Sequence, residues 1–126
     1  MKIKSRHHLK GSDARKIIAK IEPFLEDPSH LRQSSLEMAV SDDGVDLIFI
    51  EGRPLLMIVG DQPFFTVLGA MERRPYKRLL MVDSGAVRFV VNGADIMKPG
   101  IVSADPEIAV GDLVVIVEER HNKPLA

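Results

Sequence analysis

The stretch between residues 84 and 100 has the residue types that suit a surface for phosphate groups. Glycine and alanine leave main-chain N–H groups unshielded, so a polynucleotide backbone can approach them closely. Gly93-Ala94 and Pro99-Gly100 are expected to present such donors. A helix that starts at Ser84-Gly85-Ala86 would add a partial positive charge, and Arg88 and Lys98 supply full charges nearby. The alternative interpretation is that the glycines serve only as turns and a helix cap.

The densest charge run of the chain, residues 72–78, is a second candidate surface. Its cations flank a tyrosine, and such a patch can hold phosphate groups while the ring stacks on a base. The alternative interpretation is a solvated link between two small modules. The candidate residues of this run are Arg73, Arg74, Tyr76, Lys77 and Arg78.

The chain carries none of the residue patterns of the common enzyme classes. It has no cysteine, which excludes disulfides, thiolate nucleophiles and cysteine-bound zinc. It has no GxSxG elbow, P-loop, GxGxxG turn or HExxH motif. His7 and His8 are adjacent on a basic terminus without a supporting cluster, which does not make a metal site. We therefore expect no enzymatic activity, no cofactor and no bound metal.

The composition is that of a folded protein outside the membrane. Of the 126 residues, 45% are hydrophobic and 28% charged, a balance too apolar for a disordered chain. No apolar run approaches the ~18 residues of a membrane span, and the basic N-terminus lacks the apolar stretch of a secretory signal. We expect a cytoplasmic protein with no membrane partner. Its net charge of −1 means that only local basic clusters could contact phosphate.

The first half of the chain shows one helix followed by strands. Ser12 is placed to cap a helix whose apolar residues recur at three- and four-residue spacing. From residue 36 the pattern changes to short apolar runs divided by turn residues, which predicts strands at 36–40, 45–50, 53–59 and 64–68. Strands joined by short turns imply an antiparallel meander with the helix on one face.

The elements that position the first candidate surface lie in the second half. The apolar runs there predict strands at 79–82, 102–104 and 113–117. Residues 85–91 fit two structures: their β-branched content favours a strand, whereas a short helix would have Ser84 as its N-cap and a left-handed Gly93 as its C-cap. The residues alone leave this choice open.

This half resembles a PUA domain over residues 79–126. The motifs that carry the resemblance are Asp83-x-Gly85-Ala86 after a strand, Asn92-Gly93-Ala94-Asp95, Pro99-Gly100-Ile101, Gly111-Asp112 and Lys123-Pro124-Leu125-Ala126. The resemblance implies a helix at 85–91, a β pseudobarrel, and RNA binding through residues that include Asn92 and Asp95. The family pattern continues past Lys-Pro-Leu-Ala, which implies a barrel incomplete at Ala126, with an unpaired edge beside residues 113–117.

The front portion is similar to the module that precedes PUA domains in the malignant T-cell-amplified sequence group of archaeal and eukaryotic translation-associated proteins. The similarity rests on the basic start, the amphipathic helix, the meander and the direct abutment on the PUA segment. The resemblance thus implies an α+β protein, with a pre-PUA α+β module at residues 1–77 and a PUA RNA-binding domain at residues 78–126.

The resemblance implies a translation-associated RNA-binding protein. Its partners would be tRNA or rRNA, and a translation initiation factor or ribosomal subunit. Phosphate contacts position RNA without reading its sequence, so we expect recognition of structured RNA or of an exposed tRNA-like end. The alternative is a protein-interaction or assembly module that docks a translation or ribosome-associated factor without direct RNA binding.

Overall fold

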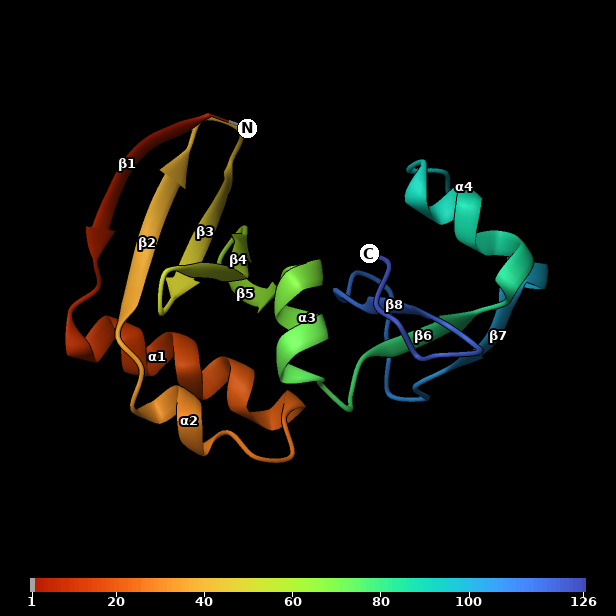
Figure 1. Cartoon of the computed structure of the whole chain (residues 1–126), viewed down its shortest axis with the longest axis horizontal. Coiled ribbons are helices and arrows are strands. Elements are labelled where there is room, and N and C mark those ends of the chain that lie inside the picture. The colour runs from red at the N-terminus through yellow and green to blue at the C-terminus, as the bar shows by residue number, and fades with distance from the viewer. Residues whose placement is uncertain (1) are drawn as a thin grey trace.

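The computed structural model describes residues 2–126 and contains two β-sheets and four α-helices. Five strands form the first sheet and three form the second, so the fold class is α+β, as expected. In Figure 1 the two sheets lie side by side with helix α3 (Val67–Arg73) between them. Within the described residues no helix has the length and apolar character needed to span a bilayer.

The first sheet is a meander whose strands pair in chain order, each antiparallel to the next. Leu36 lies opposite Ile50 and Ile48 lies opposite Leu56, which places large apolar side chains on one face. All four of these side chains are buried. The strands are β1 (Ile3–His8), β2 (Leu36–Ser41), β3 (Val45–Ile50), β4 (Arg53–Val59) and β5 (Gln62–Phe65).

Strand β1 has no counterpart among the predicted strands. Its six residues are all exposed, and they show no alternation of apolar and polar side chains that would indicate a strand. Pairing with β2, whose partner residues lie 29 to 38 positions further along the chain, holds it at the sheet edge. Charged side chains on an edge strand discourage pairing with other chains. His7 and His8 therefore belong to a strand and not to a loose terminus.

Helix α1 (Gly11–Ile21) covers one face of the first sheet through an apolar side that ends at the fully buried Ile21 (Figure 1). Lys10 holds the N-cap position and no side chain caps the helix, so the predicted cap at Ser12 is wrong. The chain then tightens into the 3₁₀ turn η1 (Glu22–Phe24), which includes Pro23. Proline lacks an N–H group and cannot continue the helical hydrogen bonds.

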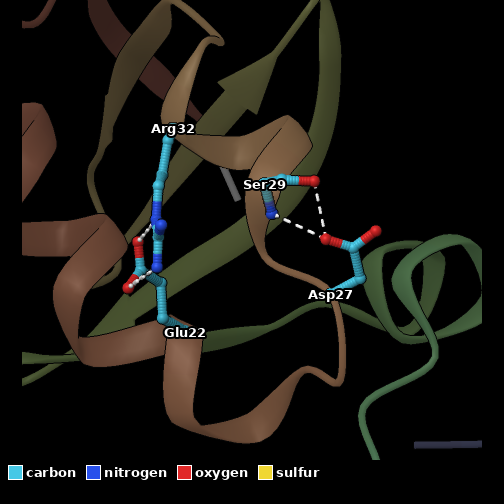
Figure 2. Close-up of polar contacts among 4 residues, drawn as sticks. All are labelled: Glu22, Asp27, Ser29 and Arg32. Atoms are coloured by element: carbon cyan, nitrogen blue, oxygen red, sulfur yellow. Dashed lines mark hydrogen bonds and ion pairs between the residues drawn. The ribbon is translucent and has the colours of Figure 1, made fainter.

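Helix α2 (Ser29–Arg32) is a single turn held by polar contacts, shown in Figure 2. The Arg32 guanidinium donates two hydrogen bonds to the Glu22 carboxylate, at 2.7 and 3.1 Å. The Asp27 carboxylate accepts hydrogen bonds from the Ser29 hydroxyl at 2.6 Å and from the Ser29 amide at 3.1 Å. A four-residue helix is unstable by itself, so these contacts and the buried Leu31 keep it in place.

These carboxyl groups make part of the stability dependent on pH. The Arg32 hydrogen bonds lower the pKa of Glu22, and the Ser29 hydroxyl and amide lower the pKa of Asp27. A carboxyl with a lowered folded-state pKa contributes stability that is present above its unfolded pKa and lost as pH falls through the folded pKa. We therefore expect the urea midpoint to decrease between about pH 5 and about pH 3.

The same contacts give a residue-level check by NMR titration of the carboxyl groups. Ser29→Ala removes the hydroxyl donor, so the pKa of Asp27 should rise toward its usual value while that of Glu22 stays lowered. An Asp27 that titrates unchanged in this variant would contradict the assigned cause.

The prediction of a strand over residues 64–68 is wrong at both ends, since the strand already begins at Gln62. Strand β5 stops at Phe65, and Thr66 caps α3. The Thr66 Oγ1 accepts a hydrogen bond from the Gly69 amide at 2.9 Å and donates one to the Pro54 carbonyl at 2.8 Å. The two phenylalanines and the threonine favour a strand by local propensity. The hydrogen bond from Thr66 to Pro54 of β4 instead holds Thr66 as the cap of α3.

The second sheet is mixed, with β6 at its centre. One neighbour of β6 runs antiparallel to it and the other runs parallel. The predicted strands are confirmed, the last of them displaced toward the C-terminus. The three strands are β6 (Leu79–Val82), β7 (Ile101–Ala104) and β8 (Val115–Glu118).

The outer edge of β8 is covered and not open. The Ile116 amide donates to the Ala126 carbonyl at 2.7 Å, and the Leu125 amide donates back to the Ile116 carbonyl at 2.7 Å. Val117 forms a further bridge with Pro124. The expected unpaired edge beside residues 113–117 is therefore wrong, because the Lys-Pro-Leu-Ala segment pairs with this strand.

The two sheets share one buried apolar cluster. Val115 and Val117 of β8 belong to the same cluster as the core side chains of α1 and the first sheet. Between the sheets, Pro75 is buried and the Tyr76 amide donates to the Phe24 carbonyl at 2.9 Å. Tyr76 and Arg78 thus contact η1, whereas Arg74 and Tyr76 keep exposed side chains, so the run is a link that is only partly solvated.

Candidate functional site

Residues 84–91 form a helical segment, which confirms the helix expected there. It consists of the 3₁₀ turn η2 (Ser84–Ala86) followed by α4 (Val87–Val91). Asp83 is the N-cap and its Oδ1 accepts from the Ala86 amide at 2.9 Å, so the predicted cap at Ser84 is wrong by one residue. The Ser84 amide donates instead to Glu119 at 3.3 Å.

The segment after α4 folds back along the helix. Gly93 has a φ of +81°, which confirms its predicted left-handed conformation. A second 3₁₀ turn, η3 (Lys98–Gly100), follows and lies against the start of η2. The Asp83 amide donates to the Gly100 carbonyl at 3.0 Å, and a Cβ on Gly100 would lie 3.5 Å from the Ala86 Cβ. The motifs at 83–86 and 98–100 are therefore in contact.

The amides proposed as free donors are already engaged. The Gly93 amide donates to the Val90 carbonyl at 3.0 Å and the Ala94 amide donates to the Phe89 carbonyl at 2.9 Å. The Gly100 amide donates to the Met97 carbonyl at 2.9 Å. The expectation of bare amides at these three positions is wrong, because each short helix satisfies its own terminal polar groups.

An apolar groove of about 520 Å³ lies between α4 and η3, and we call it the α4 groove. The Phe89 ring is 53% exposed and the Met97 side chain 72% exposed, although both line the groove and are large and apolar. The groove is lined by Asp83, Gly85, Ala86, Phe89, Val90, Ala94, Asp95, Ile96, Met97, Pro99 and Gly100.

Two cations accompany the groove. The Arg88 guanidinium lies 4.9 Å from the centre of the Phe89 ring. Lys98 begins η3 and is exposed. Neither of them forms an ion pair within residues 2–126. The exposed Asp95 offers a carboxylate acceptor in the groove itself.

The structure brings most of the first predicted set together. Gly85, Ala86, Ala94, Asp95, Pro99 and Gly100 all line the α4 groove. Asn92 and Gly93 are exposed at the end of α4. The sequence analysis did not identify Phe89 and Met97 as lining residues. For Phe89 a signal exists: at helical spacing this ring lies on the face opposite Val87, Val90 and Val91, which indicates that it is exposed.

The candidate residues of the charge run at 72–78 differ in their surroundings. Arg78 is largely buried: its guanidinium lies 3.4 Å from the Asp112 carboxylate and 5.3 Å from the centre of the Phe24 ring. Its backbone amide, together with that of Glu107, lowers the pKa of Asp105. Arg78 therefore links η1 to the loop before β8 and is less accessible than the exposed Arg74 and Tyr76.

The two candidate surfaces lie at opposite ends of β6. Arg78 precedes the strand and Asp83 follows it. Four residues of strand span roughly 13 Å. In Figure 1, α3 adjoins one end of β6 and α4 the other.

The comparisons with known proteins agree with this architecture. The family model described as PUA domain matches residues 79–126. An uncharacterised protein of Methanocaldococcus jannaschii is 35% identical over 99% of this chain and 78% of its own length. Translation machinery-associated protein 20 of Saccharomyces cerevisiae is 30% identical over 98% of this chain and 75% of its own length. The malignant T-cell-amplified sequence 1 homolog of Drosophila melanogaster is 30% identical over 98% and 74%, respectively.

A solved structure shows the same fold over nearly the whole chain. A hypothetical protein of Pyrococcus horikoshii superimposes with a TM-score of 0.84 at 31% identity, over 97% of this chain and 79% of that chain. The relatives thus match this chain in sequence and in structure over both sheets. The chain belongs to the family of PUA-domain proteins that includes translation machinery-associated protein 20 and malignant T-cell-amplified sequence 1.

Proposed function

We propose that this protein is a cytoplasmic, translation-associated RNA-binding protein whose α4 groove receives an unpaired RNA end. One observation carries the proposal: an apolar groove with a half-exposed Phe89 lies beside two cations without ion pairs, Arg88 and Lys98. Aromatic side chains stack on bases of any sequence, while cations hold the flanking phosphates. Single-stranded ends suit such a site because their bases splay out.

The groove gives each of its groups a separate task. The Arg88 guanidinium lies over one face of the Phe89 ring, 4.9 Å from its centre. The stacking face for a base would therefore be the opposite one, and Arg88 would contact a phosphate beside that base. The Asp95 carboxylate is available for a base amino group or for the ribose 2′-hydroxyl, which distinguishes RNA from DNA. In this proposal the RNA is held by base stacking and by these charged side chains, and not by free main-chain amides as the sequence suggested.

The remaining assignments follow from the family and stay proposals. Residues 78–126 would carry the RNA contact, and residues 1–77 would hold this part in place and dock a translation factor or ribosomal subunit. The name of one relative, translation machinery-associated protein 20, supports a role in translation. A tRNA acceptor end is the RNA that the groove would suit best. No chemical step is assigned to any residue.

A charge-reversal variant tests this function. Arg88→Glu with Lys98→Glu should weaken binding of single-stranded RNA at least about tenfold, because each reversal replaces a phosphate contact with repulsion. The slope of log affinity against log salt should fall by about two. A gel-shift or filter titration at several salt concentrations measures both quantities.

A second charge reversal on α1 is the matched control. Lys16→Glu with Lys20→Glu changes the net charge equally at two exposed positions far along the chain from the groove. RNA binding should stay near that of the unmodified protein. An equal loss of RNA affinity in the two double variants would show that only net charge matters. Unchanged RNA affinity in the groove variant would contradict RNA binding at the α4 groove.

Protein docking is the second candidate function, and exposed apolar side chains favour it. Val91 is 64% exposed and Val102 is 51% exposed, near the ends of α4 and β7. Apolar patches of this kind mark interaction sites. RNA affinity that falls steeply with salt supports RNA binding, whereas a stoichiometric protein complex that retains no RNA supports docking.

A further inference from the structure

A second cavity, of about 250 Å³, lies where the two sheets meet, and we call it the junction pocket. Its apolar walls come from α3, β6 and β8, whose lining side chains Ala70, Val115 and Val117 are buried. Its other lining residues include three with exposed polar side chains, Arg74, Tyr76 and Asn122. An apolar interior with few polar groups at its mouth is the usual form of a ligand site.

Tyr76 is held rigidly but remains available. Its amide donates to the Phe24 carbonyl at 2.9 Å, and the preceding Pro75 is buried against the junction. Nevertheless 48% of Tyr76 is exposed. A tyrosine whose backbone is anchored and whose ring is half exposed offers a stacking face at little cost in conformational entropy.

Two cations lie near the pocket. The Lys77 Nζ lies 5.6 Å from the centre of the Tyr76 ring, and Arg74 lines the pocket. Neither forms an ion pair within residues 2–126. Of the nearby carboxylates, Asp112 lies against the Arg78 guanidinium. Asp105 accepts from the Arg78 amide, which lowers its pKa together with the charges of Lys77 and Arg78, so it stays ionised beside them.

We propose that the junction pocket receives one unstacked base of an RNA strand, stacked on Tyr76, with Arg74 and Lys77 contacting the flanking phosphates. Free cations beside an exposed ring complement an anionic polymer whose bases all have a stacking face. The inference rests on the proposed function, because the strand that enters here is the one held in the α4 groove. The two sites lie toward opposite ends of β6, a strand of roughly 13 Å, so one single strand would bridge them.

Tyrosine variants test this site separately from the α4 groove. Fluorescence anisotropy would measure binding of a labelled single-stranded RNA of about 20 nucleotides, longer than the site of one small RNA-binding surface. Tyr76→Ala should lower affinity roughly tenfold because it removes the stacking face. Tyr76→Phe keeps the ring and should bind as the unmodified protein does. A thermal melt of both variants confirms that the fold is kept.

Crosslinking gives the second readout. With 4-thiouridine in the RNA, crosslinks should map to residues 74–77 and to α4 in the unmodified protein. In Tyr76→Ala the first set should disappear while the second remains. Loss of affinity in Tyr76→Phe equal to that in Tyr76→Ala would overturn base stacking.

The failures of the two proposals are distinguishable. RNA binding that is weakened by the Arg88 and Lys98 reversals but unchanged in Tyr76→Ala overturns the junction site alone, and leaves the pocket to a partner other than RNA. Absence of RNA binding by the unmodified protein overturns the proposed function and this inference together.

Discussion

Phe64→Ala is expected to lower the free energy of unfolding by about 3–5 kcal/mol, the usual cost of removing a buried phenylalanine ring. Phe64 is 2% exposed at the centre of an aromatic cluster. Its ring centre lies 5.9 Å from that of Phe24 and 5.5 Å from that of Phe65, and both pairs meet edge to face. A loss of this size is a large share of the roughly 5–15 kcal/mol that stabilises a typical domain.

The effect should also reach the second sheet. Phe24 touches Phe64 on one side, and on the other its ring lies beneath the Arg78 guanidinium and its carbonyl accepts from the Tyr76 amide. Urea unfolding followed by circular dichroism measures the loss, and tyrosine fluorescence of Tyr76 reports on the junction. We expect both signals to move to the same lower urea concentration.

Phe89→Ala is the matched control for Phe64→Ala. It removes the same side chain from a position that is 53% exposed, so the free energy of unfolding should change by no more than about 0.5 kcal/mol. Its RNA affinity should fall, in accordance with the proposed stacking role. Equal destabilisation by the two variants would contradict the position of the core.

Gly69→Ala is the second large effect, with an expected loss of about 3 kcal/mol. A Cβ at this position would lie 1.8 Å from the Leu55 carbonyl oxygen and 2.8 Å from the Leu55 carbonyl carbon. Both are backbone atoms of β4, and the Thr66 amide donates to the same oxygen at 3.2 Å. Neither partner can turn away as a flexible side chain would, so α3 must move off the sheet to accept a methyl group.

Gly11→Ala is the matched glycine control, measured by the same thermal or urea unfolding. Its new Cβ would meet only the Arg15 guanidinium nitrogen at 3.2 Å, at the end of a flexible side chain. The stability should change by no more than about 0.5 kcal/mol. A Gly69→Ala variant as stable as Gly11→Ala would show that α3 does not pack on β4 as described.

Much of the fold was predictable because its signals are local. The apolar spacing of α1, the strands divided by turn residues and the left-handed Gly93 all follow from neighbours within a few positions. Strand β1 and helix α3 were missed for the opposite reason. The charged β1 is a strand because β2 pairs with it, and α3 starts at Thr66 because Pro54 and Gly69 hold that side chain.

The candidate site was predictable in position but not in mechanism. The glycine motifs indicated residues 84–100, and the structure brings most of them around one groove. Their amides are engaged within the segment, so the exposed Phe89 and the unpaired Arg88 become the groups available to a ligand. In the charge run, Arg78 and Arg74 are chemically alike, and only burial against Phe24 separates their roles.

By itself, the sequence determined helix α1, most of the strands, the family and the segment that forms the groove, because turn residues, apolar periodicity and motif spacing act over short distances along the chain. Only the tertiary structure decided which amides are already bonded, which arginine is buried between the sheets, and that Val115 and Val117 complete the core of the first sheet. The burial of this arginine and the shared core depend on contacts between residues tens of positions apart, which exist only once the two sheets have packed together. The amides are instead bonded within the folded segment itself, to partners three to five positions away.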